Sequence, residues 1–304
     1  MKIEKGNLPN LIIIGGMKSG TTSLHHYLNL HPEICMSRQK ELNFFIEERN
    51  WSRGIQWYKS HFEAEAKIYG ESSPNYTMYP IWKSVPERMF SVIPETKLIY
   101  IIRNPIEQII SHYVHKYAVG KENRSIEQAL AELDENQYIE RSKYFLQLEQ
   151  YLQFFSNSSI LIITSEELSN FPQKTMKRVF QFLEVDADFE FKFNIKSIGE
   201  VLKFGPAITN SNFNFNKKIH QSSTKFKTKI PADSPMITTL SKITALLSPE
   251  IRFHVEKIIY RPFSQKVERP KINDTLRERL LEYLAEDISK LKEYTGYEFK
   301  EWNL

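Results

Sequence analysis

The chain has 304 residues, 41% of them hydrophobic and 13% aromatic, which is enough to bury the core of one large α/β domain. Its 41 basic and 37 acidic side chains leave a net charge of +4, which suits an anionic ligand but excludes the strongly basic balance of a nucleic-acid-binding protein. The single cysteine, Cys35, excludes a disulfide framework and a cysteine-rich metal site, and it favours a reducing compartment.

The N-terminal region contains one short apolar run, residues 11–16, which ends at two glycines. This run is too short to span a membrane, and no small-residue cleavage site follows it. We therefore expect a cytoplasmic protein that has neither a membrane nor a nucleic acid as a partner.

Three apolar runs, residues 11–16, 97–103 and 159–164, are short and rich in isoleucine, as expected of strands that are buried on both faces. Residues 34–36 and 67–70 are weaker strand candidates. A helix-like segment follows each of the three principal runs. This alternation predicts an α/β fold with a central parallel sheet flanked by helices.

We expect a single domain over residues 1–304, with its core over residues 8–188. Residues 189–270 have no clear periodicity and are rich in Asn, Phe, Lys and Ser, which predicts a loop-rich lid or acceptor-binding region. In the last region, 271–304, residues 274–294 carry apolar side chains at helical spacing. We expect them to form a C-terminal helix that packs on the core.

A glycine-containing turn joins the first predicted strand to a helix, and it carries one lysine and four hydroxyl side chains. In this context, backbone N–H groups, the positive end of the helix and the hydroxyls point to one place, which is typical of phosphate binding. The predicted ligands are Lys18, Ser19, Gly20, Thr21, Thr22 and Ser23. The alternative is a glycine turn that serves only the strand-to-helix geometry.

The spacing of this turn differs from that of ATP-hydrolysing proteins. Their P-loop places the lysine directly after the last glycine, whereas Lys18 precedes Gly20 by two positions. They also need an acidic magnesium ligand at the end of a second strand, whereas the strand over 97–103 ends in Arg103. The sequence therefore indicates a phosphate site without a metal.

A second anion site is predicted after the strand that ends at Arg103. Pro105 suits the first turn of the following helix, which carries Ser111 two turns along. The guanidinium and this hydroxyl together suit a second phosphate. The alternative for Arg103 is a surface ion pair at a strand end.

The two motifs, in this order, resemble those of the sulfotransferases that use 3′-phosphoadenosine 5′-phosphosulfate (PAPS). In that family the first motif grips the 5′-phosphosulfate and the second grips the 3′-phosphate. Further stretches are similar to the heparan sulfate N- and 3-O-sulfotransferase branch, namely KELNFF (40–45), GIQWYKSHF (54–62), GESSPNY (70–76), YFLQLEQYLQFF (144–155) and ILIITSEEL (160–168). The resemblance covers about residues 10–185 and implies a P-loop-like fold, PAPS as co-substrate without a metal, and adenosine 3′,5′-bisphosphate (PAP) as product.

The resemblance also implies roles for individual residues. Lys18 stabilises the leaving group, and Glu41 is the base that accepts the acceptor's proton. We expect Leu42, Phe44 and Phe45 to bury Glu41 and so strengthen it as a base; the alternative is a surface glutamate paired with Lys40. Lys225 and Lys227 are candidates for a loop that closes over the nucleotide, and Glu71, Asn43 and Phe45 are candidates for acceptor contacts.

Two departures from the branch concern the acceptor. Residue 72 is serine where glycan enzymes of this branch commonly carry lysine, and residue 43 is asparagine where the 3-O type carries histidine. Both weaken the case for an acidic glycan and leave a neutral sugar or a small natural-product alcohol or amine open as the acceptor. Two other functions remain as alternatives, a P-loop kinase that uses ATP and magnesium, and a nucleotide-binding protein without turnover.

Overall fold

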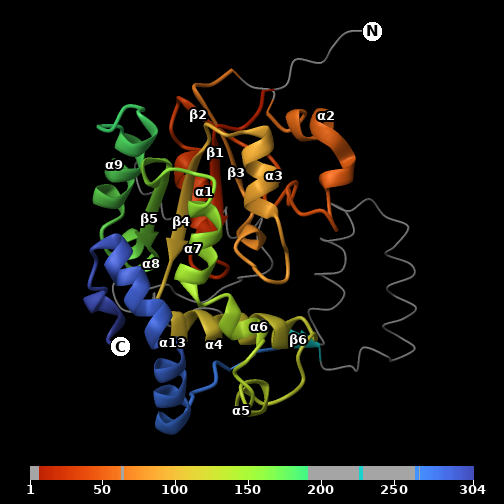
Figure 1. Cartoon of the computed structure of the whole chain (residues 1–304), viewed down its shortest axis with the longest axis vertical. Coiled ribbons are helices and arrows are strands. Elements are labelled where there is room, and N and C mark those ends of the chain that lie inside the picture. Colours follow the sequence, from red (N-terminus) through yellow and green to blue (C-terminus); the bar gives the residue numbers. More distant parts are fainter. Residues whose placement is uncertain (1–6, 63–64, 191–225, 229–263, 267) are drawn as a thin grey trace. The chain divides into compact units, whose positions relative to one another are not determined.

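The computed structural model describes residues 7–62, 65–190, 226–228, 264–266 and 268–304 (Figure 1). The chain forms two compact units. The first comprises residues 1–109, 132–192 and 274–304, and the second comprises residues 110–131 and 193–273. Whether the two units form one domain, as the sequence predicts, is not determined by this division, so the single domain remains a prediction.

The first unit is built on a five-stranded sheet in the order β2-β3-β1-β4-β5, and every adjacent pair is parallel. The strands are β1 (Leu11–Gly15), β2 (Ile34–Met36), β3 (Ile68–Ser72), β4 (Lys97–Ile102) and β5 (Ile160–Thr164). All five strands predicted from the sequence are thus confirmed. Because the strands are parallel, the residues that follow them meet at one edge of the sheet.

Helices connect and cover the strands (Figure 1). Those of the first unit are α1 (Thr21–Leu28), α2 (Gly54–Lys59), α3 (Val85–Val92), α6 (Gln137–Glu140), α7 (Tyr144–Leu152), α8 (Ser165–Asn170), α9 (Pro172–Leu183) and α13 (Asp274–Thr295). Short 3-10 turns occur at η1 (Trp51–Arg53), η2 (Pro74–Tyr76), η3 (Asn157–Ser159) and η5 (Lys300–Trp302). Helix α4 (Pro105–Ala118) begins in the first unit and ends in the second.

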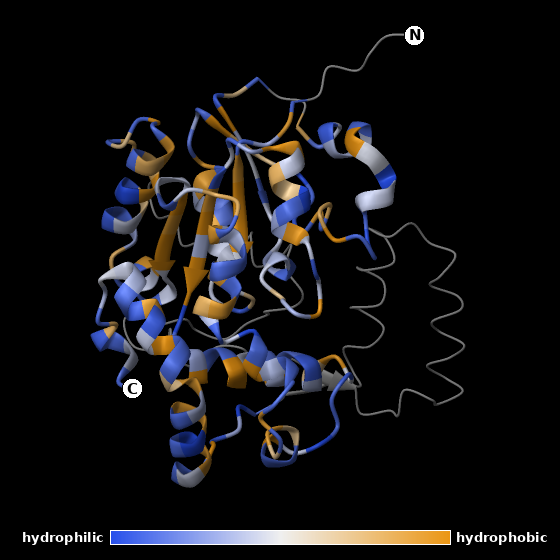
Figure 2. Cartoon of the chain, viewed as in Figure 1, coloured by the Kyte–Doolittle hydropathy of each residue, from blue (hydrophilic) through white to orange (hydrophobic). Residues whose placement is uncertain are grey.

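The sheet is buried on both faces, and Figure 2 shows β4 and β5 mostly in the hydrophobic colour. On one face Ile12, Ile14, Leu98, Tyr100 and Ile162 pack in a cluster with residues of α3 and α7. The alternating residues of the same strands, such as Ile13 and Ile99, are equally buried. Burial on both faces is what the continuous apolar runs predicted.

The predicted C-terminal helix is confirmed as α13, which packs against α7. Its Asp287 accepts hydrogen bonds from the backbone N–H groups of Phe145 and Leu146, at 3.0 and 2.8 Å, in the first turn of α7. Burial raises the pKa of this carboxyl to about 6, and the two N–H groups oppose the rise. The contact fixes the start of α7, where Tyr144 lies.

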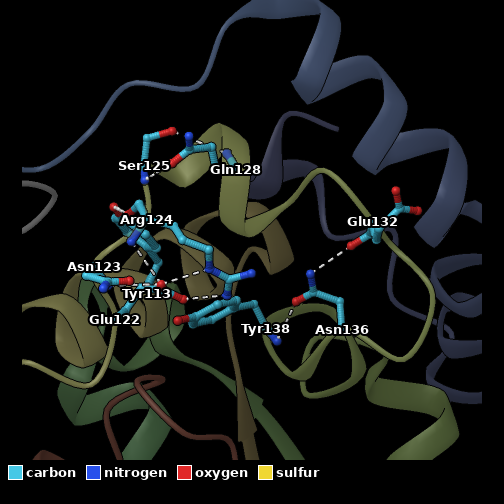
Figure 3. A network of polar contacts seen from close by, with 9 residues as sticks. All are labelled: Tyr113, Glu122, Asn123, Arg124, Ser125, Gln128, Glu132, Asn136 and Tyr138. Carbon is cyan, nitrogen blue, oxygen red and sulfur yellow. Dashed lines mark hydrogen bonds and ion pairs between the residues drawn. The ribbon is translucent and has the colours of Figure 1, made fainter.

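The second unit contains α5 (Ile126–Ala129) and a short antiparallel pair, β6 (Phe226–Thr228) with β7 (Ser264–Lys266). Before α5, the buried Glu122 accepts two hydrogen bonds from the Arg124 guanidinium, at 3.0 and 2.7 Å (Figure 3). Tyr113 donates to the Arg124 carbonyl at 2.7 Å. Fork-like pairing of this kind fixes geometry as well as charge.

Several predictions fall at or beyond the limits of the described residues. Lys225 and most of the predicted lid, 189–270, lie outside them, and only the backbone of Lys227, in β6, lies within them. Their roles therefore remain predictions. Within the described ranges, no helix is long and apolar enough to cross a membrane.

Candidate active site

The predicted phosphate loop forms a tight turn between β1 and α1. Gly20 caps the helix with φ 99°, and Lys18 also has positive φ, at 65°. The turn is closed by the Ser19 N–H, which donates to the Gly16 carbonyl at 3.1 Å. Ser19 and Thr21 are buried, whereas Thr22 and Ser23 are exposed. We call residues 16–23 the cradle.

Arg103, which follows β4, lies against the cradle. Its guanidinium donates to the Lys18 carbonyl at 3.1 Å and pairs with Glu107 at 3.4 Å, and its side chain is 17% exposed. The ion pair that the sequence left open for Arg103 is therefore present, together with the contact to the cradle. Ser111 is buried in the part of α4 that belongs to the second unit, so its cooperation with Arg103 remains a prediction.

A network from distant segments holds the turn that follows Arg103. The Asn104 side chain donates to the Trp302 carbonyl at 2.5 Å and accepts from the Glu107 N–H at 3.1 Å. The Asn104 N–H donates to Glu166 at 3.1 Å, and the Trp302 indole donates to the same carboxylate at 3.4 Å. Trp302 is itself buried, so the turn is tied to both α8 and η5.

Three buried polar groups beside the cradle make no hydrogen bond, namely the Ser19 hydroxyl, the Tyr144 hydroxyl and Nε of Arg103. Burial raises the pKa of Tyr144, while the charge of Arg103 opposes the rise, so this phenol keeps its proton near neutral pH. Ser19 and the Arg103 backbone lie close to the Tyr144 hydroxyl without forming a hydrogen bond of normal geometry. Buried donors without acceptors are costly, and an anionic ligand satisfies them.

The loop that contains Glu41 is fixed to the end of β3. Glu41 and Asn43 have positive φ, 65° and 49°, an uncommon conformation for residues other than glycine. The Glu41 N–H donates to the Ser72 carbonyl at 3.0 Å, and the Asn43 N–H donates to the Ser73 hydroxyl at 3.0 Å. The Phe45 N–H donates to the Tyr76 hydroxyl at 3.4 Å. These contacts hold the unusual backbone.

The predicted burial of Glu41 is wrong, because its side chain is 48% exposed. Leu42, Phe44 and Phe45 point into the hydrophobic core and leave the carboxylate at the surface. The ion pair with Lys40, the alternative that the sequence left open, is present at 3.3 Å. Lys40 also donates to the Thr21 hydroxyl at 3.3 Å, and this contact places Glu41 near the cradle.

Glu71 is completely buried at the end of β3, and neither of its carboxylate oxygens makes a hydrogen bond. Burial raises the pKa of this carboxyl to about 8, and the nearby hydroxyls of Tyr76, Tyr58 and Ser73 offset part of the rise. Asn43 and Phe45 are buried as well. All three predicted acceptor contacts, Glu71, Asn43 and Phe45, are thus buried, and their role toward the acceptor remains a prediction.

The charges around the cradle suit an anion. Besides Lys18, Lys40 and Arg103, the buried guanidinium of Arg141 contacts Met17 of the cradle. Burial lowers the pKa of Arg141 to about 10, so this side chain remains charged at neutral pH. No cluster of His, Cys, Asp and Glu suited to a metal occurs among the residues that the structure describes. The fold and the cradle define an α/β protein of the P-loop-like, phosphate-binding class.

Comparisons with known proteins identify the family. Residues 8–232 match the model of the sulfotransferase domain. The chain is 30% identical to human heparan sulfate glucosamine 3-O-sulfotransferase 5 over 251 residues, which are 77% of this chain and 68% of that protein. It is 38% identical to the membrane-associated sulfotransferase kil1 of Dictyostelium discoideum over 123 residues, 39% of this chain. This chain belongs to the sulfotransferase family.

The chain spans only a quarter of the length of the Dictyostelium protein. Among solved structures, a sulfotransferase from Alicyclobacillus acidocaldarius has the same fold, with a TM-score of 0.66 at 20% identity. That match covers 98% of this chain and 100% of the bacterial one. The predicted fold class is thereby confirmed.

Proposed function

We propose that this chain is an enzyme that transfers a sulfuryl group from PAPS to a hydroxyl or amine of a saccharide or small-molecule acceptor. The observation that carries the proposal is the set of buried, unsatisfied donors at Ser19, Tyr144 and Arg103, beside a helix N-terminus. A ligand with two phosphate groups and a sulfate supplies acceptors for such donors. Membership of the sulfotransferase family specifies the reaction class.

The reaction is an in-line displacement. The acceptor oxygen or nitrogen forms a bond to sulfur while the bond between sulfur and the 5′-phosphate oxygen breaks, which leaves PAP. Lys18 neutralises the charge that develops on the leaving oxygen. Glu41 takes the proton from the acceptor, and its exposure gives it access to a ligand above the sheet edge. No metal ion takes part in this scheme.

The acceptor is proposed to be neutral or weakly charged. One relative is named for heparan sulfate, an acidic glycan, but serine stands at position 72 and contributes no charge at the end of β3. The cation that contacts Glu41 is Lys40, from the same loop. A cytoplasmic location is also part of the proposal, and its support is the single cysteine, which suits a reducing compartment.

Calorimetry tests the donor. The chain should bind PAP far more tightly than AMP or ATP, and magnesium should leave the affinity unchanged. A single-turnover assay with PAPS and a panel of phenols, alcohols, amines and sugars should proceed in EDTA. Tight binding of ATP with magnesium would instead support the kinase alternative, which the family does not favour, and PAP binding without turnover would support a non-catalytic protein.

A further inference from the structure

Lys40 links two parts of the site that the sequence treated separately. Its ammonium is 3.3 Å from the Thr21 hydroxyl in the cradle and 3.3 Å from the Glu41 carboxylate. The Lys40 side chain is only 22% exposed. One cation therefore contacts both the predicted donor site and the predicted base.

The surroundings of Lys40 favour a second anion. Burial lowers the pKa of Lys40, and Glu41 offsets only part of this effect. On α1, burial and then the charge of Lys40 lower the pKa of His25 to about 4, so His25 is neutral at physiological pH. Burial also lowers the pKa of the neighbouring His26. Of these three side chains, Lys40 is the one that brings a positive charge to the Thr21 hydroxyl.

The ion pair with Glu41 is weak enough to exchange. Exposed pairs of this kind contribute little to stability, because solvent screens them and holding two side chains costs entropy. A charge-assisted hydrogen bond in a more buried place is stronger. An anionic group held at the N-terminus of α1, beside Thr21, therefore competes well for the Lys40 ammonium.

We propose that Lys40 is a catalytic lysine that exchanges its ion pair with Glu41 for the sulfuryl group of the donor, and thereby frees Glu41 to accept the acceptor's proton. This inference rests on the proposed function. Lys40 keeps its own protons throughout, while the acceptor proton moves to Glu41 and the sulfur–oxygen bond to the leaving phosphate breaks. The base is unmasked only when a donor occupies the cradle.

Binding in the absence of an acceptor tests the exchange without any turnover. PAPS and PAP differ by the sulfuryl group, so their affinity ratio reports contacts to that group alone. In Lys40→Met, the affinity for PAPS should fall by roughly 10- to 100-fold, the range expected for one lost charge-assisted hydrogen bond. The affinity for PAP should change by less than about threefold, because the cradle keeps its other donors.

A matched control is Lys67→Met, which removes a lysine paired with Glu33 at 3.8 Å, before the start of β3. This variant should leave both affinities unchanged, and Lys40→Arg should retain most of the preference for PAPS. Equal losses of PAPS and PAP affinity in Lys40→Met would overturn the inference, since Lys40 would then act only on the cradle through Thr21. Wild-type protein that binds neither nucleotide would overturn the proposed function itself.

Discussion

The ends of β3 and β4 lie on the same edge of the sheet but are stabilised in opposite ways. After β4, the side chain of Asn104 has partners for both its amide nitrogen and its oxygen, and its N–H is bonded to Glu166. At the end of β3, the Glu71 carboxyl is completely buried; no hydrogen bond of standard geometry reaches its oxygens, and only the hydroxyls of Tyr76, Tyr58 and Ser73 lie near it. The turn after β4 is therefore held by a network in which the polar groups of Asn104 have partners, whereas the end of β3 contains a buried carboxyl that is disfavoured in its ionised form.

This difference assigns different tasks to the two ends. A satisfied network fixes its neighbours in one geometry, which suits the recognition of a rigid anion by Arg103. A buried carboxyl with a raised pKa is stable only while it is protonated, so the end of β3 should respond to pH. The loop with Glu41 is bonded to that end. We therefore expect changes near the end of β3 to affect mainly the rate of transfer, and changes after β4 to affect mainly nucleotide binding.

The sharpest separation of the two ends is expected from Glu41→Gln. Glutamine keeps the size of the side chain but cannot accept the acceptor's proton. General base catalysis is worth about a hundred- to ten-thousandfold, so turnover should fall by that order while PAP affinity stays nearly unchanged. Single-turnover rates and calorimetry measure the two effects.

The control is Glu48→Gln, an exposed glutamate seven residues further along the chain. It should leave both turnover and PAP affinity unchanged. A large loss of PAP affinity in Glu41→Gln would remove the separation, because Glu41 would then shape the phosphate site through Lys40. Near-normal turnover would assign the base to another residue.

The β4 end is tested directly by Arg103→Met. Arg103 is predicted to read the 3′-phosphate, so the preference for PAP over AMP should fall by roughly 10- to 100-fold, as expected for lost charge-assisted contacts. Arg178→Met, which removes a guanidinium paired with Glu167 at 3.1 Å, is the control and should retain the preference. An unchanged preference in Arg103→Met would leave Arg103 as a structural partner of Glu107 and Lys18 only.

The parts of the site also differ in how well the sequence predicted them. The cradle and its position after β1 were predictable, because the glycines, Lys18 and the hydroxyls lie within nine residues and their geometry is local. The contact of Arg103 with the cradle was not predicted, because it depends on the strand order, in which β1 and β4 are parallel neighbours and their ends meet. The five strands were predictable from continuous apolar runs.

The long-range contacts that hold the site residues in place could not be predicted from the sequence. Trp302 and Asn104 are 198 residues apart, and neither periodicity nor a local motif indicates their hydrogen bond. Tyr144 was recognised only as part of a helical stretch, because its hydroxyl gains a role only when α7 packs beside the cradle. The exposure of Glu41 was mispredicted because three apolar neighbours suggested burial, whereas those side chains pack in the core and leave the carboxylate at the surface.

A smaller effect at β4 is expected from Asn104→Ala. The variant removes the hydrogen bond to Trp302 and the side-chain cap of α4, so the turn after Arg103 loses its fixed geometry. The PAP to AMP preference should fall by about two- to tenfold, the range for one neutral hydrogen bond. Loss of the cap should also lower the melting temperature.

Asn136→Ala is a matched control for that prediction. Asn136 is also an asparagine N-cap, at the start of α6, where it accepts from the Tyr138 N–H at 3.0 Å (Figure 3). It should lower the melting temperature to a similar extent and leave the nucleotide preference unchanged. The same change of preference in both variants would show that general loosening, and not the turn after Arg103, is responsible.

The prediction specific to β3 is the pH dependence of stability in Glu71→Gln. Burial raises the pKa of Glu71 to about 8 in the folded protein, from an ordinary value of 4.5. Between these two values the folded state holds a proton that the unfolded state has released, so the stability of the wild type falls as pH rises and the loss is complete above about pH 8. Glutamine is neutral throughout and should remove this dependence of stability on pH.

Since one unit of pKa difference corresponds to about 1.4 kcal/mol, the melting temperatures of the two proteins should diverge by at least a few degrees between about pH 6 and pH 9. Groups that titrate in both proteins cancel in the comparison. Parallel curves would mean that Glu71 ionises without penalty, and the contrast between the two strand ends would then be one of shape alone.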